Sequence, residues 1–266
     1  MVEAMACLGG RTELGLLQAA AGEPASVVEQ RLAPALGAGV LVMESGPLEA
    51  VRFRHDRIRE VFLDGLDPRR RRTLQLTMAR RLALVNALLS AALPLTDPGD
   101  TAMLADVHTA RHAALFCLGR LDEADEEYRA IERLRPAALD RAAATAVQIT
   151  SLTHANRSAE AVGLGLESMR ALGIPVPEAD RTAAELGRQL DYLYQWLDQT
   201  DTADDLARPE LADAALVAAT RLIDAVLTAV YLIPDVSLYA WLSLEALRIW
   251  LRHGPGRPFA SPLPRA

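Results

Sequence analysis

The sequence predicts an all-α protein that carries one small β wing. Ala, Leu and Arg dominate, and only 5% of the residues are aromatic, a composition that favours helix. Apolar residues recur at helical spacing through most of the chain after residue 67. Short apolar runs at 40–43 and 50–53 flank a turn at 45–47, and the strands are expected there.

Composition excludes several classes of protein. The 266 residues, of which 51% are hydrophobic and 24% charged, suffice for one large or two ordinary domains. All 28 basic residues are Arg, and the net charge of −7 argues against a nucleic-acid surface that covers the chain. Cys7 and Cys117 have no metal-ligand spacing. They are expected to be buried, reduced thiols, as in the cytoplasm.

The chain carries no targeting or membrane signal of the usual kind. The residues after Met1 contain no basic n-region and no sustained apolar run. Arg, Asp or Glu interrupts each Ala/Leu-rich run before the roughly 20 apolar residues that a spanning helix needs. The sequence therefore predicts a soluble, cytoplasmic protein without membrane contact.

The first 66 residues have the element order of a winged-helix domain. Gly9 and Gly10 end a first helix, which is short, as in a domain truncated at its N-terminus. Thr12 is expected to N-cap a second helix, and a third runs over 25–38. Three helices before a two-stranded wing predict a winged helix at 1–66.

A winged helix suggests DNA binding, but the third helix is poorly equipped for it. Gln30 and Arg31, beside Glu29, are its main groups that can contact bases or phosphates. A structural or protein-contacting winged helix is therefore the favoured interpretation. A DNA-binding transcriptional regulator remains the second alternative.

One motif, Phe53 to Glu60 (FRHDRIRE), joins the wing to the helices that follow. It resembles the F-x-H-D-R-[IV]-[RQ]-E signature that closes the winged helix of STAND-class signalling ATPases, especially bacterial regulators with an AAA-type ATPase module. It is also similar to the M-H-D motif of nucleotide-binding immune receptors, with Arg54 in place of Met. By this resemblance, His55 senses the β-phosphate of ADP and Asp56 caps the following helix.

The resemblance stops at the nucleotide-binding core. A P-loop needs Lys, and the chain contains none, so ADP or ATP belongs to the related proteins and no cofactor is expected in this chain. The relatives carry Ser/Thr kinase, adenylate cyclase, histidine kinase or LuxR-type output modules, and no such motif occurs here. The alternative for His55 is a junction histidine that hydrogen-bonds a backbone carbonyl.

Residues 67–253 are predicted to form a tetratricopeptide-like α-superhelix, followed by a Pro-rich tail at 254–266. The segment 118–136 resembles the second half of such a repeat, with a weaker copy from Ala155, and Gly119 and Asn156 lie 37 residues apart. By this resemblance the repeat-packing residues are Gly119, Leu121, Ala124, Tyr128 and Pro136.

Other chemistry-bearing residues form no convincing constellation. His108 and His112 are spaced i, i+4, but no nearby Glu or Cys in the sequence completes a metal site, and Asp204-Asp205 has no partner ligands. Four arginines at 69–72 are expected to form a solvated helix start or a domain-contact surface. No catalytic residue and no metal site is predicted.

By these resemblances the chain is expected to be a non-catalytic sensor and scaffold segment, similar to the region after the ATPase module of a bacterial signalling ATPase. It is expected to bind protein partners through the repeat surface, and a nucleotide-binding domain through the winged helix. Nucleic acid is not an expected partner. The first alternative is a free-standing tetratricopeptide-type adaptor that never meets a nucleotide.

Overall fold

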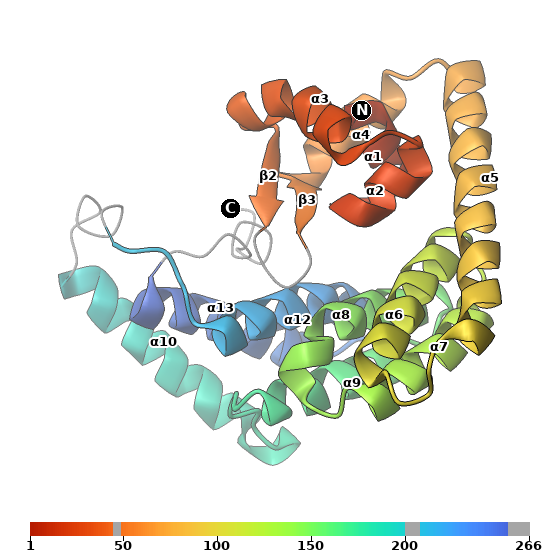
Figure 1. The fold of residues 1–266 in the computed structure, drawn as a ribbon. Helices are drawn as coiled ribbons and strands as arrows, with labels where there is room; N and C mark the ends of the chain where they lie inside the picture. Colours follow the sequence, from red (N-terminus) through yellow and green to blue (C-terminus); the bar gives the residue numbers. More distant parts are fainter. Residues whose placement is uncertain (45–48, 200–207, 255–266) are drawn as a thin grey trace. The chain divides into compact units, whose positions relative to one another are not determined.

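The computed structural model describes residues 1–44, 49–199 and 208–254. They form two compact units, Met1–Leu134 and Arg135–Ala266, and each is described by itself. The described residues are mostly helical (Figure 1). They contain one three-stranded sheet, which confirms the predicted all-α class with a small β element. The predicted turn at 45–47, the Asp204-Asp205 pair and the tail beyond Gly254 lie outside the described residues.

The first unit contains seven α-helices, three strands and a 3-10 turn within its described residues. In chain order they are α1 Val2–Leu8, β1 Arg11–Glu13, α2 Leu14–Ala21, α3 Ala25–Gly37, β2 Leu41–Glu44, β3 Ala50–Phe53, α4 Asp56–Asp64, α5 Pro68–Ala92, η1 Leu93–Leu95, α6 Thr101–Cys117 and α7 Leu121–Leu134. The strand order is β1-β3-β2, and both pairings are antiparallel.

The prediction that Thr12 begins a helix was wrong. Thr12 lies in β1, pairs with Val51 of β3 and is 3% exposed, while α2 begins at Leu14. Three residues give too little alternation to reveal a strand, and their partner strand lies far along the chain. The backbone groups of β1 are hydrogen-bonded by β3, and nothing in the sequence around Thr12 indicates that partner.

The two faces of the sheet have different chemistry, because successive strand residues point to opposite sides. One face contributes Leu41, Val51 and Phe53 to the core of the first unit. The α5 residues Met78 and Leu82 complete this core, and both are at most 3% exposed. The opposite face carries the charged side chains of Arg11, Glu44 and Arg52.

Arginines of α4 and α5 bind the ends of the first two helices. The Nε of Arg59 donates to the Ala6 carbonyl at 3.0 Å, and Nη1 of Arg81 donates to the Ala20 carbonyl at 3.2 Å. The last carbonyls of a helix have no intrahelical partner, so these guanidinium groups satisfy acceptors that would otherwise need water.

The second unit is entirely helical in its described residues. It comprises α8 Ala138–His154, α9 Ser158–Ala171, η2 Ala179–Arg181, α10 Thr182–Gln199, α12 Ala214–Tyr231 and α13 Val236–His253. The helix expected from Pro209 begins five residues later, because the Asp213 side chain accepts from the Leu216 amide at 3.0 Å and caps α12. Trp241 is fully buried at the centre of this unit.

The boundary between the units falls after α7, inside the range 67–253 assigned to one repeat domain. Helix α5 packs against α2 and α6 within the first unit, and α8, α9 and α12 pack together within the second. The first unit thus includes the helices that follow its sheet.

Two of the described helices are long and apolar enough to cross a membrane by length and composition alone. They are Pro68–Leu95 and Ala214–Tyr231. The apolar window of the second is 50% buried within the protein, as expected for a core helix, whereas the window of the first is only 17% buried.

Candidate functional site

The candidate site is the strand-to-helix junction formed by Phe53 to Glu60. Strand β3 ends at Phe53, and His55 occupies the N-cap position of α4 with extended backbone angles, φ −141° and ψ 141°. The His55 carbonyl accepts from the Ile58 amide at 3.0 Å. Its side chain is exposed and has no hydrogen bond or ion pair within the described residues. The imidazole is therefore available to another molecule.

The prediction that Asp56 caps α4 was wrong. Asp56 is the first helical residue, and the N-cap residue is His55, whose side chain makes no capping hydrogen bond. The N-cap is the last residue with non-helical angles, and His55 still has extended angles. The Asp56 carboxylate instead lies in the first turn of α4, where it stabilises the positive end of the helix dipole.

Two exposed arginines flank His55. The Arg54 amide donates to the Val40 carbonyl at 3.0 Å, and its guanidinium lies 3.2 Å from the place where a Cβ on Gly39 would stand. The side chain of Arg57 is 85% exposed and lies 3.8 Å from Glu60. The guanidinium of Arg54 beside the imidazole produces a local positive potential that attracts anions such as phosphate, whereas the charge of Arg57 is partly compensated by Glu60.

The remaining residues of the junction anchor it to the core. The Phe53 and Phe62 rings lie 6.0 Å apart in a tilted arrangement, and Phe53 is 3% exposed. Ile58 packs against the core of the first unit, and Arg59 binds the carbonyl of Ala6. The motif therefore divides by role: Phe53, Ile58 and Arg59 hold the junction in place, while Arg54, His55 and Arg57 face outward.

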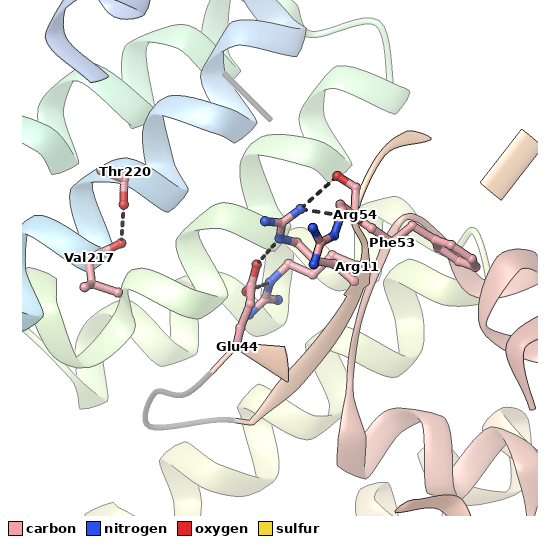
Figure 2. A network of polar contacts seen from close by, with 7 residues as sticks. Arg11, Glu44, Phe53, Arg54, Val217 and Thr220 are labelled. Carbon is pink, nitrogen blue, oxygen red and sulfur yellow. Dashed lines mark hydrogen bonds and ion pairs between the residues drawn. The ribbon is translucent and has the colours of Figure 1, made fainter. Parts of the chain in front are cut away.

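A buried ion-pair network crosses the sheet from which the junction leaves. Oε2 of Glu44 accepts from Nε of Arg11 at 2.8 Å, and its Oε1 lies 2.9 Å from Nε of Arg52 (Figure 2). The side chains of Glu44 and Arg52 are only 4% and 9% exposed. Nη1 of Arg52 also donates to the Phe53 carbonyl at 3.2 Å, which ties the network to the start of the junction.

Sequence reasoning missed this network because it missed β1. Arg11 lies opposite Arg52 in the register of β1 and β3, and β2 brings Glu44 to the same face. The signal present in the sequence was Arg52, a charged residue inside an otherwise apolar strand. Such a residue needs a partner, but nothing local identifies which one.

The α6–α7 and α8–α9 hairpins have the same turn. Gly119 and Asn156 both have left-handed backbones, with φ of 73° and 60°. The residue after each donates to a carbonyl five positions earlier, from Arg120 to Leu115 at 3.0 Å and from Arg157 to Leu152 at 2.8 Å. This is the Schellman motif of a helix C-terminus.

The matching extends to the side chains that follow each turn. Arg120 pairs with Glu123, and Arg157 pairs with Glu160 at 2.7 Å; both pairs are spaced i, i+3. Each second helix then buries an alanine, Ala124 or Ala161, at 0% exposure. The two hairpins therefore repeat backbone, ion pair and packing position.

The remaining predicted packing residues lie in different environments. Tyr128 is 4% exposed and its ring centroid is 5.8 Å from that of His112. Leu121 is half-buried at the start of α7, and Pro136 is exposed in the connection from α7 to α8. Tyr128 thus packs within the hairpin, whereas Pro136 interrupts the helix without being buried.

Gly119→Ala is expected to lower the free energy of unfolding by about 1 kcal/mol, because alanine is strained at φ 73°. No atom stands within 4 Å of the place where the new Cβ would lie, so the cost comes from the backbone. Gly187→Ala is the matched control. It lies inside α10 with equally open space and is expected to stabilise by up to about 1 kcal/mol. Urea denaturation of both variants measures the change in the free energy of unfolding. A change of the same sign in the two variants would contradict the left-handed turn at Gly119.

The histidine pair on α6 has partners that the sequence did not show. Nδ1 of His108 lies 2.6 Å from Oε2 of Glu127 on α7, and Nη1 of Arg111 lies 2.7 Å from Oε1 of the same carboxylate. His112 packs instead against Tyr128. Within the described residues no group of three or more His, Cys, Asp or Glu side chains is placed to hold a metal ion.

The two cysteines are free thiols, as predicted, but they are half-buried rather than buried. Burial raises the pKa of Cys117 to about 12, and it also raises the pKa of Cys7. The thiolate is the reactive form of cysteine, so a raised pKa disfavours nucleophilic chemistry at either position.

Comparison with protein-family models, with curated proteins and with solved structures finds no match to this chain.

Proposed function

We propose that this chain is a non-catalytic sensor and scaffold segment that resembles the region after the ATPase module in STAND-class bacterial signalling regulators. The observation that carries the proposal is the exposed imidazole of His55, flanked by Arg54 and Arg57 on a junction that is anchored in the core. The outward-facing side chains can bind a phosphate that a neighbouring module holds. The anchoring side chains connect that binding to the core of the first unit.

The order of elements in the first unit supports the winged-helix part of the proposal. The element order of helix, strand, two helices and two strands, with β1 joining the sheet beside β3, matches the order expected of a winged helix. In that arrangement β2 and β3 form the wing, and the junction is the exit from it.

A sensor must convert the contact into a change of equilibrium between two states. A nucleotide module that presents ADP phosphates to His55 would stabilise the docked state by one charge-assisted hydrogen bond and by attraction to Arg54. Losing that contact would favour release of the first unit. Protein partners would then bind the helical hairpins, whose matched turns support the tetratricopeptide-like assignment.

His55→Ala tests the sensor role in a protein that joins this chain to a P-loop module. The variant is expected to release ADP roughly ten- to a hundredfold faster, since a hydrogen bond to a charged group contributes about 1.5–3 kcal/mol. His253→Ala removes another exposed histidine, from the second unit, and is expected to leave the rate unchanged. Stopped-flow release of a fluorescent ADP analogue measures both. Unchanged release in His55→Ala would reject the sensor role and favour a free-standing adaptor.

The structure gives little support to DNA binding. The third helix presents Arg31, but its Nη1 lies 3.1 Å from Oε1 of Glu23, which neutralises its charge. Titration of the chain with random duplex DNA at low and physiological salt distinguishes a DNA-binding regulator from a sensor segment, because phosphate contacts strengthen steeply at low salt. Tight binding at low salt would favour the regulator over the sensor segment.

We also propose a cytoplasmic location, in keeping with the two free thiols.

A further inference from the structure

Helix α10 buries much less of its surface than the other long helices of the second unit. Its buried residues are Thr182 and Gln189, and both are polar. Helix α12 has the same length of 18 residues and buries nine residues, of which only Thr220 is polar. Because burial of apolar surface supplies most of the free energy that holds an element in place, α10 is held much more weakly than α12.

The packing partners of α10 are also fewer. Within the second unit it packs mainly against α13 and the η2 turn, whereas α12 packs against α8, α9 and α13 (Figure 1). The outer side of α10 carries Leu190, Tyr194 and Leu197, which are 39%, 63% and 54% exposed. In the described range 182–199, no apolar side chain is fully buried while the helix is docked.

The contact between α10 and α13 is centred on a buried carboxylate, that of Glu245, which is 0% exposed. Nε2 of Gln189 donates to its Oε2 at 2.9 Å. Nε of Arg248 donates to the same oxygen at 2.7 Å, and Nη2 of Arg248 binds Oε1. Because Arg248 lies on α13 itself, three residues after Glu245, the carboxylate keeps its charge partner when α10 leaves.

Docking leaves one polar atom of α10 poorly satisfied. Oε1 of Gln189 is buried and has no hydrogen-bond partner within the described residues. A buried acceptor without a partner raises the free energy of the docked state, and release returns this oxygen to water. The guanidinium of Arg252 lies 5.1 Å from the centroid of the Tyr192 ring, but Arg252 is exposed, so this contact adds little.

We propose that α10 detaches from α13 by local opening while α8, α9, α12 and α13 stay folded. Release exposes the paired side chains of Glu245 and Arg248, together with the half-buried inner side of α10 around Gln189. The second unit therefore has a surface that exists only in the open state. This conformational change involves no residue of the junction around His55, so it does not depend on the proposed sensor contact.

Hydrogen exchange of the full chain under native conditions, resolved by mass spectrometry of its peptides, tests the proposal. The amides of α10 are expected to be protected at least about a hundredfold less than those of α12, since α10 opens locally. Low concentrations of urea are expected to accelerate exchange in α12 but hardly in α10, because local opening exposes little surface. Equal protection and equal urea dependence in the two helices would overturn the proposal.

Gln189→Glu tests the contact itself. The variant keeps the size of the side chain but places a second carboxylate beside Glu245, so protection of α10 is expected to fall at least about tenfold further. Protection of α12 is expected to stay unchanged, which also verifies folding. Gln195→Glu makes the same change at an exposed position of α10 and is expected to alter protection less than about twofold. Unchanged protection of α10 in Gln189→Glu, or an equal loss in α10 and α12, would refute local opening.

Discussion

Glu44→Gln is expected to lower the free energy of unfolding of the first unit by about 3 kcal/mol, because breaking a buried ion pair leaves the remaining charge uncompensated. The side chain of Glu44 is 4% exposed and contacts Arg11 and Arg52. Glutamine keeps the shape and one acceptor oxygen but removes the negative charge. Arg52, itself 8% exposed, would retain its charge in a buried position.

Native-state hydrogen exchange of the β3 amides measures this effect in the first unit. Glu49→Gln is the matched control: Glu49 is exposed and lies just before β3, and its change is expected to be within about 0.5 kcal/mol. Equal protection in the two variants would show that the network does not stabilise the sheet. Because Arg52 also binds the Phe53 carbonyl, loss of the network is expected to raise exchange at the start of the junction.

Gly165→Ala is expected to lower the free energy of unfolding of the second unit by about 2 kcal/mol, because the new methyl group overpacks a buried contact. A Cβ on Gly165 would stand 2.0 Å from Cγ2 of Val226 and 3.3 Å from Cδ1 of Ile149. Valine in a helix has essentially one χ1 rotamer, so Val226 cannot turn away, and α9 and α12 must separate. The better helix propensity of alanine, about 1 kcal/mol, offsets only part of this cost.

The control for this prediction lies in the same helix. Gly163 has no atom within 4 Å of a Cβ position, so Gly163→Ala is expected to stabilise by up to about 1 kcal/mol. Chemical denaturation followed by tryptophan fluorescence reports on this unit, since Trp196, Trp241 and Trp250 all belong to it. The double variant Gly165→Ala, Val226→Ala is expected to lose less free energy of unfolding than the sum of the two single variants, because the clash is removed. Losses that simply add would contradict the clash.

Local signals in the sequence predicted much of the secondary structure. Asp67 and Pro68 mark the start of α5, where the Asp67 side chain accepts from the Arg70 amide at 3.0 Å. Gly119 marks the turn of the first hairpin, and α13 was expected over its observed range. Each of these features is decided within a few residues by a cap, a fixed proline angle or a left-handed glycine.

Features that depend on distant partners were missed. The three residues of β1 became a strand because β3 pairs with them, and Glu44 found its partners only when β1 and β2 were placed on either side of β3. The location of His55 at the junction was anticipated, but its N-cap position was not.

By itself the sequence determined the helical class, the strands β2 and β3, the paired turns and the motif at the junction, because caps, turns and periodicity act over a few residues. Tertiary structure decided the third strand, the buried carboxylate between two arginines, the contact of Gly165 with Val226 and the boundary after α7. Those features depend on segments far apart in the chain, whose packing is set by burial of apolar surface and pairing of charge, and no local pattern specifies it.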